Sequence, residues 1–208
     1  MLFDVTRREL ADIFGEHRIA ALPASVFPPP AADTEGARLL GTVGVPTGTL
    51  RLPEPDEDTG RLPLVQDVVD AECFEGASQD AGEWPVIGWL LNAHLALDPV
   101  SGKVHAIDAD EETVRELHTD VSSLVQVTLR FQRLLEEFTF SGDDTDGDDE
   151  EADFERLERE VDRIRQETSG IDPLPFRDDE TVWSMVGEEI AAGQRFTGNS
   201  PGARSLYG

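Results

Sequence analysis

The side chains best suited to chemistry in this sequence are four histidines and one cysteine. His17, His94, His105 and His118 are scattered along the chain, and Cys73 stands alone. His94 and His105 flank a predicted hairpin and could approach each other across it, but no carboxylate or thiol at a metal-site spacing completes a ligand set. We therefore expect both at solvent-facing strand positions. Nothing local activates Cys73 as a nucleophile, and we expect a buried free thiol.

An acidic run late in the chain is a second candidate, because regularly spaced carboxylates can bind Ca²⁺. With Gly147 at the sixth position of an EF-hand loop, Asp144 and Asp146 occupy the third and fifth positions. The first position is then Gly142 and the twelfth is Asp153, so two of the usual ligands are missing. We expect a solvated acidic linker and predict no metal site.

Sequence signatures of catalysis and of nucleotide binding are missing. Gly41, Gly44 and Gly48 are not followed by the Lys-Ser/Thr pair of a phosphate-binding loop. Nucleophile-elbow, metalloprotease-helix and zinc-deaminase patterns do not occur either. We predict that the protein is not an enzyme and uses no cofactor.

The dominant property of the composition is its negative charge. The chain has 44 acidic and 17 basic residues, and the formal net charge is -27. A field of this sign repels nucleic acid and anionic membranes and accelerates encounters with a basic protein. Acidity that serves only solubility is the open alternative. The longest apolar stretch is too short to span a bilayer, and a single cysteine suits a cytoplasmic protein.

Hydrophobic periodicity and turn residues predict the elements of the first 140 residues. Thr6 starts a short amphipathic helix that ends near Gly15, and Asp33 caps a second short helix that ends before Gly41. A buried strand is predicted over 86–91, followed by a hairpin of strands 94–98 and 103–108 around a Pro-Val-Ser-Gly turn. The patterning is weaker over 52–64 and 65–74, where further strands are predicted.

The later part of the chain has helical periodicity. A long helix is predicted from Ser122 to Phe138, a charged helix after the acidic run, and a last helix over 179–192. The predicted organisation is a domain over 1–140, an acidic flexible linker over 141–153, helices over 154–193 that could pack on the same domain, and a flexible tail over 194–208.

Three short motifs carry a family resemblance. Leu39–Pro46, Ile87-Gly88 with the hairpin Leu95–Val104, and the serine-started helix from Val121 through Phe131 and Leu135 resemble successive elements of the SUKH superfamily. The chain is most similar to the fourth SUKH immunity subfamily of bacterial polymorphic toxin systems. The resemblance extends over about residues 10–138.

The resemblance implies an α+β fold in which helices flank a mixed central β-sheet, here with a C-terminal helical extension. It also implies a cytoplasmic immunity protein (antitoxin) that binds a cognate toxin, often a nuclease or nucleic-acid deaminase, and occludes its active site. A non-catalytic regulatory or scaffold module of the same fold is the alternative. No catalytic residues transfer from the family, and the oligomeric state stays open.

Exposed acidic side chains are the predicted contacts to a basic toxin, with a tryptophan as a desolvated anchor. Trp84 and Trp89 are the candidates for that anchor, and Trp89 is better suited to the core. The predicted acidic contacts lie in three segments of the chain: Asp56, Glu57 and Asp58; Asp108, Asp110, Glu111 and Glu112; and Asp143, Asp144, Asp146, Asp148 and Asp149.

Overall fold

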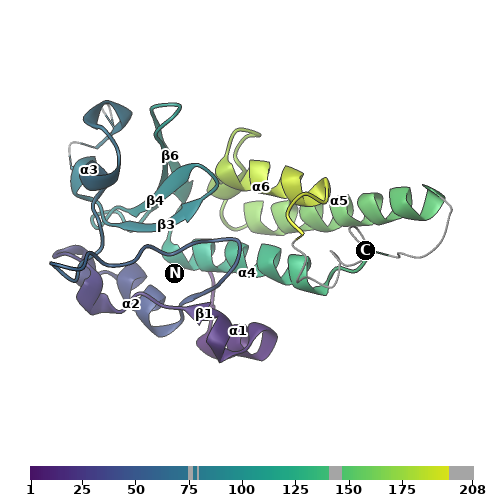
Figure 1. The fold of residues 1–208 in the computed structure, drawn as a ribbon, viewed down its shortest axis with the longest axis horizontal. Coiled ribbons are helices and arrows are strands. Elements are labelled where there is room, and N and C mark those ends of the chain that lie inside the picture. The colour runs from purple at the N-terminus through teal and green to yellow at the C-terminus, as the bar shows by residue number, and fades with distance from the viewer. Residues whose placement is uncertain (75–76, 79, 141–146, 197–208) are drawn as a thin grey trace. The chain divides into compact units, whose positions relative to one another are not determined.

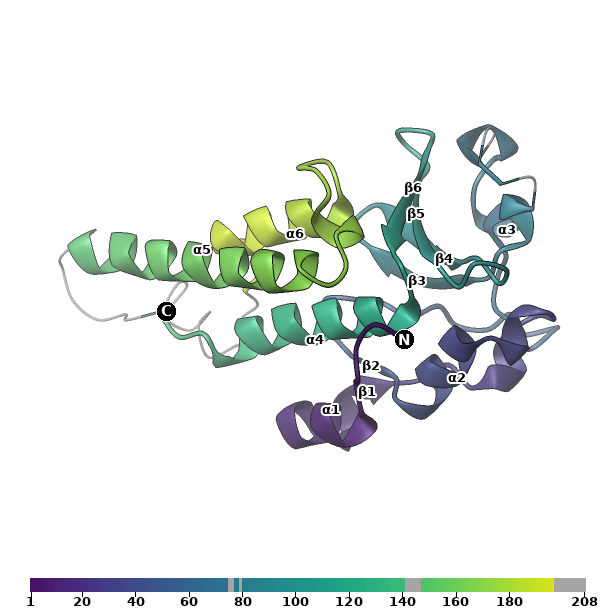
Figure 2. The same cartoon turned by 180° about the vertical axis from the view of Figure 1, so that it is seen from behind.

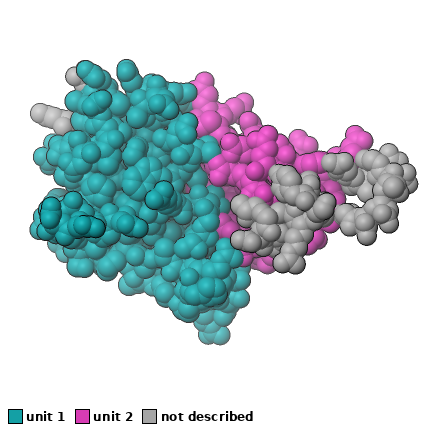
Figure 3. Space-filling model, in the orientation of Figure 1, with its two compact units in different colours: residues 1–128 teal, residues 129–208 magenta. Residues whose placement is uncertain are grey.

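The computed structural model describes residues 1–74, 77–78, 80–140 and 147–196. The chain divides into two compact units, residues 1–128 and residues 129–208, which Figure 3 colours separately. The division falls inside the long helix α4 (Val121–Glu137), upstream of the domain end expected at residue 140. None of the described helices is long and apolar enough to cross a membrane.

The first unit contains the sheets and is built from antiparallel strands (Figure 1). The main sheet has the order β3-β4-β5-β6, with strands Val86–Leu90, Ala93–Leu97, Val104–Asp108 and Thr113–His118. A separate pair joins β1 (Ile19–Ala20) to β2 (Val45–Pro46). The α+β fold is thus confirmed, but the described sheets are antiparallel where a mixed sheet was expected, because consecutive strands are joined by tight turns.

The described helices of the first unit are short, apart from α4. The α-helices are α1 (Arg7–Phe14), α2 (Glu35–Thr42) and α3 (Val65–Val68). Single 3-10 turns lie at Glu16–Arg18, Ala24–Val26, Ala31–Asp33, Ala71–Phe74 and Ala81–Glu83.

Side-chain caps start the first two helices. Thr6 accepts a hydrogen bond from the Glu9 amide at 3.2 Å, as predicted for α1. In α2 the cap is Thr34, which accepts from the Ala37 amide at 3.1 Å, and not Asp33 as predicted. The preceding 3-10 turn includes Asp33 and so moves the first α-helical turn one residue later.

The predicted hairpin is confirmed and sets the two faces of the sheet. Ala96 pairs with His105 and Leu97 with Val104, and Gly102 has φ 76° in the turn, where a left-handed conformation favours glycine. Because side chains alternate along a strand, the odd-numbered residues of β4 lie on one face and His94, Ala96 and Asp98 on the other.

The odd-numbered residues of β4 face the apolar core. Leu95 and Leu97 are fully buried. A Cβ atom on Gly36 would lie 2.6 Å from Val121 Cγ2 and 3.5 Å from Leu97 Cδ1, so α2 approaches the sheet and the start of α4 closely at this glycine.

The opposite face is covered by the segment for which additional strands were predicted. Residues 65–74 instead form α3, an extended residue at Val69 and a 3-10 turn, and the buried side chains of Val65, Val69 and Cys73 pack on the sheet. Their cluster with the sheet consists of Val65, Val69, Cys73, Ala81, Trp84, Val86, Ala96 and Ile107. Cys73 is buried, as predicted.

The second unit is helical in its described part. It contains the end of α4, then α5 (Gly147–Ser169), a 3-10 turn at Leu174–Phe176 and α6 (Val182–Ala191). Figures 1 and 2 show α5 and α6 side by side. The acidic linker expected over 141–153 is helical from Gly147 onward. Acidic residues in the first turns of a helix interact favourably with the helix dipole.

Stacked aromatic rings form the centre of this unit. The rings of Phe131 and Trp183 are parallel within 15°, with centroids 5.5 Å apart, and both side chains are fully buried. Leu157, Val161 and Ile164 form the buried face of α5. Gly187 lets α6 approach that face, since a Cβ there would lie 3.1 Å from Val161 Cγ1.

Candidate partner-binding site

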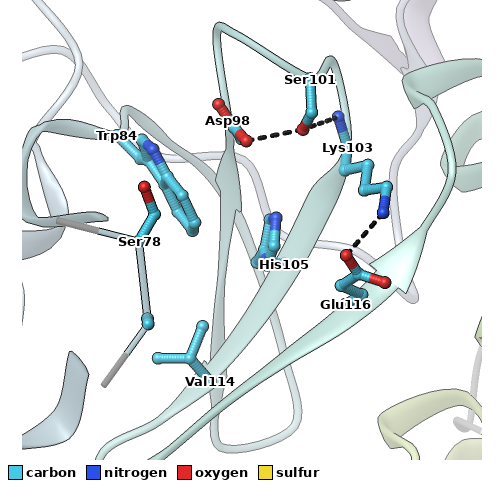
Figure 4. A pocket seen from close by; sticks show the side chains of 9 residues that line it. Ser78, Trp84, Asp98, Ser101, Lys103, His105, Val114 and Glu116 are labelled. Atoms are coloured by element: carbon cyan, nitrogen blue, oxygen red, sulfur yellow. Dashed lines mark hydrogen bonds and ion pairs between the residues drawn. The ribbon is translucent and has the colours of Figure 1, made fainter. Parts of the chain in front are cut away.

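A pocket of about 300 Å³ opens beside the hairpin turn of the first unit. The β4–β5 turn and strands β5 and β6 supply most of its polar side chains, and the segment that precedes β3 supplies one wall (Figure 4). The lining residues are Ala77, Ser78, Trp84, Asp98, Ser101, Lys103, His105, Val114 and Glu116.

Backbone hydrogen bonds fix the wall that contains Trp84. The Trp84 carbonyl accepts from the Val65 amide at 3.0 Å, and the Pro85 carbonyl accepts from the Leu97 amide at 3.0 Å. These bonds join the segment to α3 on one side and to β4 on the other. Trp84 is only 2 % exposed, so a partner would reach it only from inside the pocket.

The hairpin turn holds Asp98 in a fixed orientation at the pocket. Its carboxylate accepts from the Val100 amide at 2.8 Å and from the Ser101 hydroxyl at 2.6 Å. The backbone closes the same turn, as the Asp98 amide donates to the Lys103 carbonyl at 3.0 Å. Asp98 has no cationic partner among the residues that the structure describes.

Lys103 and Glu116 form an ion pair in the pocket lining. Lys103 Nζ lies 2.5 Å from Glu116 Oε1, and the two side chains are 34 % and 40 % exposed. The lining contains two carboxylates, those of Asp98 and Glu116, and one ammonium group, that of Lys103. It therefore has one net negative charge. The sequence has no other lysine.

His105 forms the floor of the pocket together with Trp84. The two ring centroids are 4.3 Å apart at an interplanar angle of 37°. His105 is 9 % exposed, and its Nε2 is buried without a hydrogen-bond partner in the described part of the chain. Burial lowers the pKa of the His105 imidazole, although the carboxylates of Asp98 and Glu116 act to raise it. The ring is therefore neutral near pH 7.

His94 and Trp89 repeat this arrangement at the other end of the sheet. They are register partners across β3 and β4, with ring centroids 5.3 Å apart. His94 Nδ1 is also buried without a partner in the described residues, and burial lowers the pKa of this imidazole. The expectation of a solvent-facing position was wrong for His105, which is buried, whereas His94 is half-buried; each ring packs on a tryptophan.

The predicted acidic contacts of the Asp56 loop are exposed. Asp56, Glu57 and Asp58 lie on a turn in which Asp56 Oδ1 accepts from the Asp58 amide at 3.1 Å and the Thr59 amide at 2.8 Å. The hydrogen bonds from Thr59 lower the pKa of Asp56.

The second predicted acidic group forms the turn between β5 and β6. Asp108 Oδ1 accepts from the Asp110 and Glu111 amides at 2.9 and 3.1 Å, and Asp110, Glu111 and Glu112 are exposed. The β4–β5 turn with Asp98 and the acidic turn lie at opposite ends of β5, and Val114 of the pocket lining lies two residues after Glu112.

The third predicted acidic group lies only partly within the described residues. Asp143, Asp144 and Asp146 lie outside the described residues, and Asp148 and Asp149 fall in the first turn of α5. Of the calcium-loop candidates, Asp153 is buried and pairs with Arg156 at 3.0 Å. No group of three or more metal-ligating side chains occurs among the described residues.

Sequence reasoning placed Trp84 at a binding surface but missed the polar residues beside it. Asp98 and Lys103 were interpreted only as strand residues and Ser101 as a turn residue, and Glu116 lies on a strand that was not predicted. One signal was present in the sequence. Alternation along the strand places His94 and Asp98 on the same face as Ala96. A strand face that packs on an apolar core usually has apolar residues, so these two polar residues were unexpected there.

The family model of the SUKH-4 immunity protein matches residues 5–189. The chain belongs to the SUKH-4 immunity protein family. No curated protein and no solved structure gives a significant match to the chain.

The SUKH-4 match extends beyond the motifs recognised in the sequence. It begins just before α1 and includes α5 and most of α6, so the C-terminal helices belong to the region that defines the family. The family supports an immunity role, and immunity proteins of this family are generally non-catalytic.

Proposed function

We propose that this SUKH-4 protein neutralises a cognate basic toxin, of nuclease or nucleic-acid deaminase type, by binding it in the cytoplasm and occluding its active site. The family match over residues 5–189 is the observation that carries the proposal. An immunity protein needs a toxin as its partner. The negative charge of this chain is complementary to a positively charged surface on that toxin.

Electrostatics supports a basic partner. A net charge of -27 attracts a cationic toxin from a distance and orients the encounter. A toxin that acts on nucleic acid has a basic substrate groove, which a surface rich in carboxylates complements. The exposed turns at Asp56–Asp58 and Asp110–Glu112 are two such surfaces in the first unit.

Exposed charges accelerate association but contribute little affinity. An exposed ion pair contributes only about 0.2–1 kcal/mol, so the acidic turns alone do not make a tight complex. Desolvated contacts have to provide the remaining affinity.

Co-expression with a toxin whose gene lies next to the gene of this chain tests the proposal. Cells that produce the toxin together with the wild-type protein should survive, and cells that produce the toxin alone should die. Death of the cells despite ample soluble and folded protein would overturn the proposal for that pair.

Association kinetics test the part assigned to the acidic turns. Neutralising Asp110, Glu111 and Glu112 to their amides should slow association with the toxin by about threefold or more at low salt, and the effect should disappear at high salt. Asp108 is kept because it caps the turn. Equal association rates at low salt would remove this turn from the binding surface.

A further inference from the structure

We infer that the pocket beside the hairpin turn receives an arginine side chain of the bound toxin. The inference rests on the proposed function, because the toxin presents the arginine. It defines a specific contact in the first unit, distinct from the acidic turns, and it combines Asp98, His105 and Trp84 into one site (Figure 4).

Charge is the first argument. The lining has one net negative charge, because Lys103 neutralises Glu116 but nothing described neutralises Asp98. The Asp98 carboxylate is already oriented by hydrogen bonds from Val100 and Ser101. A preoriented carboxylate inside a pocket favours a cation and disfavours an anion.

The unpartnered nitrogen of His105 is the second argument. A buried polar atom without a hydrogen bond is unfavourable for the fold, and Nε2 of this ring has none among the described residues. The ring is neutral, so Nε2 can accept a hydrogen bond when the proton is on Nδ1. A guanidinium group has five N–H donors and no acceptor, which matches an acceptor-rich pocket.

Shape and surface are the third argument. The volume of about 300 Å³ suits a side chain, and the rings of Trp84 and His105 line it with aromatic surface. Arginine combines a flat cation with an apolar stem, so it can contact this aromatic surface and the Asp98 carboxylate at the same time.

A titration of the full-length protein with N-acetyl-arginine amide, followed by the NMR signals of the Trp84 indole and the His105 ring, tests the inference. We expect saturable shifts with a dissociation constant in the millimolar range, because a single side chain supplies a small part of an interface. N-acetyl-citrulline amide has the same shape without the charge and should give much smaller shifts. Equal shifts with both compounds, or none with either, would overturn the inference.

Two pocket variants and one control define the contact. Asp98→Asn removes the charge and keeps the acceptor for the Val100 amide, and His105→Phe keeps the ring and removes the nitrogen. Each should weaken binding of the arginine amide by about tenfold. Asp12→Asn makes the same charge change at an exposed position of α1, outside the pocket lining and the acidic turns, and should leave binding unchanged. Wild-type affinity in Asp98→Asn would contradict the inference.

The outcome is separable from that of the proposed function. The titration contains no toxin, so absent binding would exclude the arginine pocket and leave the immunity role intact. Failure to protect cells in the co-expression experiment would exclude the immunity role for that pair, whatever the titration shows.

Discussion

Two buried histidines in adjacent strands of one sheet have opposite environments. His118, at the end of β6, is fully buried, and its Nδ1 lies 2.8 Å from the Ser123 hydroxyl in the first turn of α4. His105 in β5 is 9 % exposed, and its Nε2 has no partner among the described residues. The His118 ring is hydrogen-bonded within the core, whereas the His105 ring lines a pocket.

The difference distinguishes polar groups that stabilise the fold from polar groups that are available to bind a partner. A buried hydrogen-bonded pair contributes to stability, whereas a buried group without a partner costs about 1–3 kcal/mol. The fold satisfies His118 with a local serine, but it leaves His105 beside a carboxylate that also has no cationic partner in the described chain. We therefore expect the His118 corner to control stability and the His105 pocket to control binding.

Removing the His118 ring should have the largest effect on stability. His118→Ala leaves a cavity and an unpaired Ser123 hydroxyl, and it should lower the free energy of unfolding by about 2–4 kcal/mol. Chemical denaturation followed by far-UV circular dichroism measures the loss. A loss below about 1 kcal/mol would show that the corner is not structural.

His105→Phe should have a much smaller effect on stability. The substitution keeps an aromatic ring against Trp84 and removes the unpartnered nitrogen, so the free energy of unfolding should change by less than about 1 kcal/mol in either direction. The same denaturation experiment applies. A loss as large as that of His118→Ala would remove the distinction between the two histidines.

The pH dependence of stability should depend on His105 and His94. Burial lowers both pKa values from 6.5, so the unfolded chain binds protons at a higher pH than the folded chain. The free energy of unfolding should therefore fall as the pH drops below about 6.5. Asp98 and Glu116 weaken the effect at His105, whereas Lys103 strengthens it.

The double variant His94→Phe with His105→Phe provides the control for this pH dependence. Its stability should change less than that of the wild type between pH 6.5 and pH 5, a window above the ordinary pKa range of carboxylates. An unchanged slope in the double variant would assign the pH dependence to other groups.

The Lys103–Glu116 pair should have the smallest effect on stability. Both side chains are more than one-third exposed, so Lys103→Gln should cost less than about 1 kcal/mol. The same change gives the pocket a second net negative charge, and N-acetyl-arginine amide should bind about two- to fivefold more tightly. Weaker binding of the arginine amide would show that Lys103 is not a competing cation.

Local signals predicted the parts of the fold that depend on local chemistry. The cap at Thr6, the end of α1 at Gly15 and the Asp98–Lys103 turn follow from residue types within a few positions. The helix α4 also followed from its apolar spacing. Residues 65–74 were predicted as strands from weak patterning, but they form a single helical turn and a 3-10 turn that pack on the sheet.

The pocket was harder to predict because its residues meet only in the folded sheet. The pairing of His105 with Glu116 depends on β6, which was not predicted, and on a register shift beside Val104. The contact between His105 and Trp84 depends on how the segment before β3 packs over the sheet. Neither feature has a signature within a short window of sequence.

The affinity of the cognate toxin for the wild type, Asp98→Asn and Asp12→Asn tests the central claim most directly. Isothermal titration should show at least about tenfold weaker binding to Asp98→Asn, because the variant leaves a desolvated toxin cation unpaired. Binding to Asp12→Asn, an exposed change on α1 outside the predicted contacts, should stay within about twofold of the wild type. Equal affinity of all three proteins for the toxin would contradict the claim that the pocket contacts it.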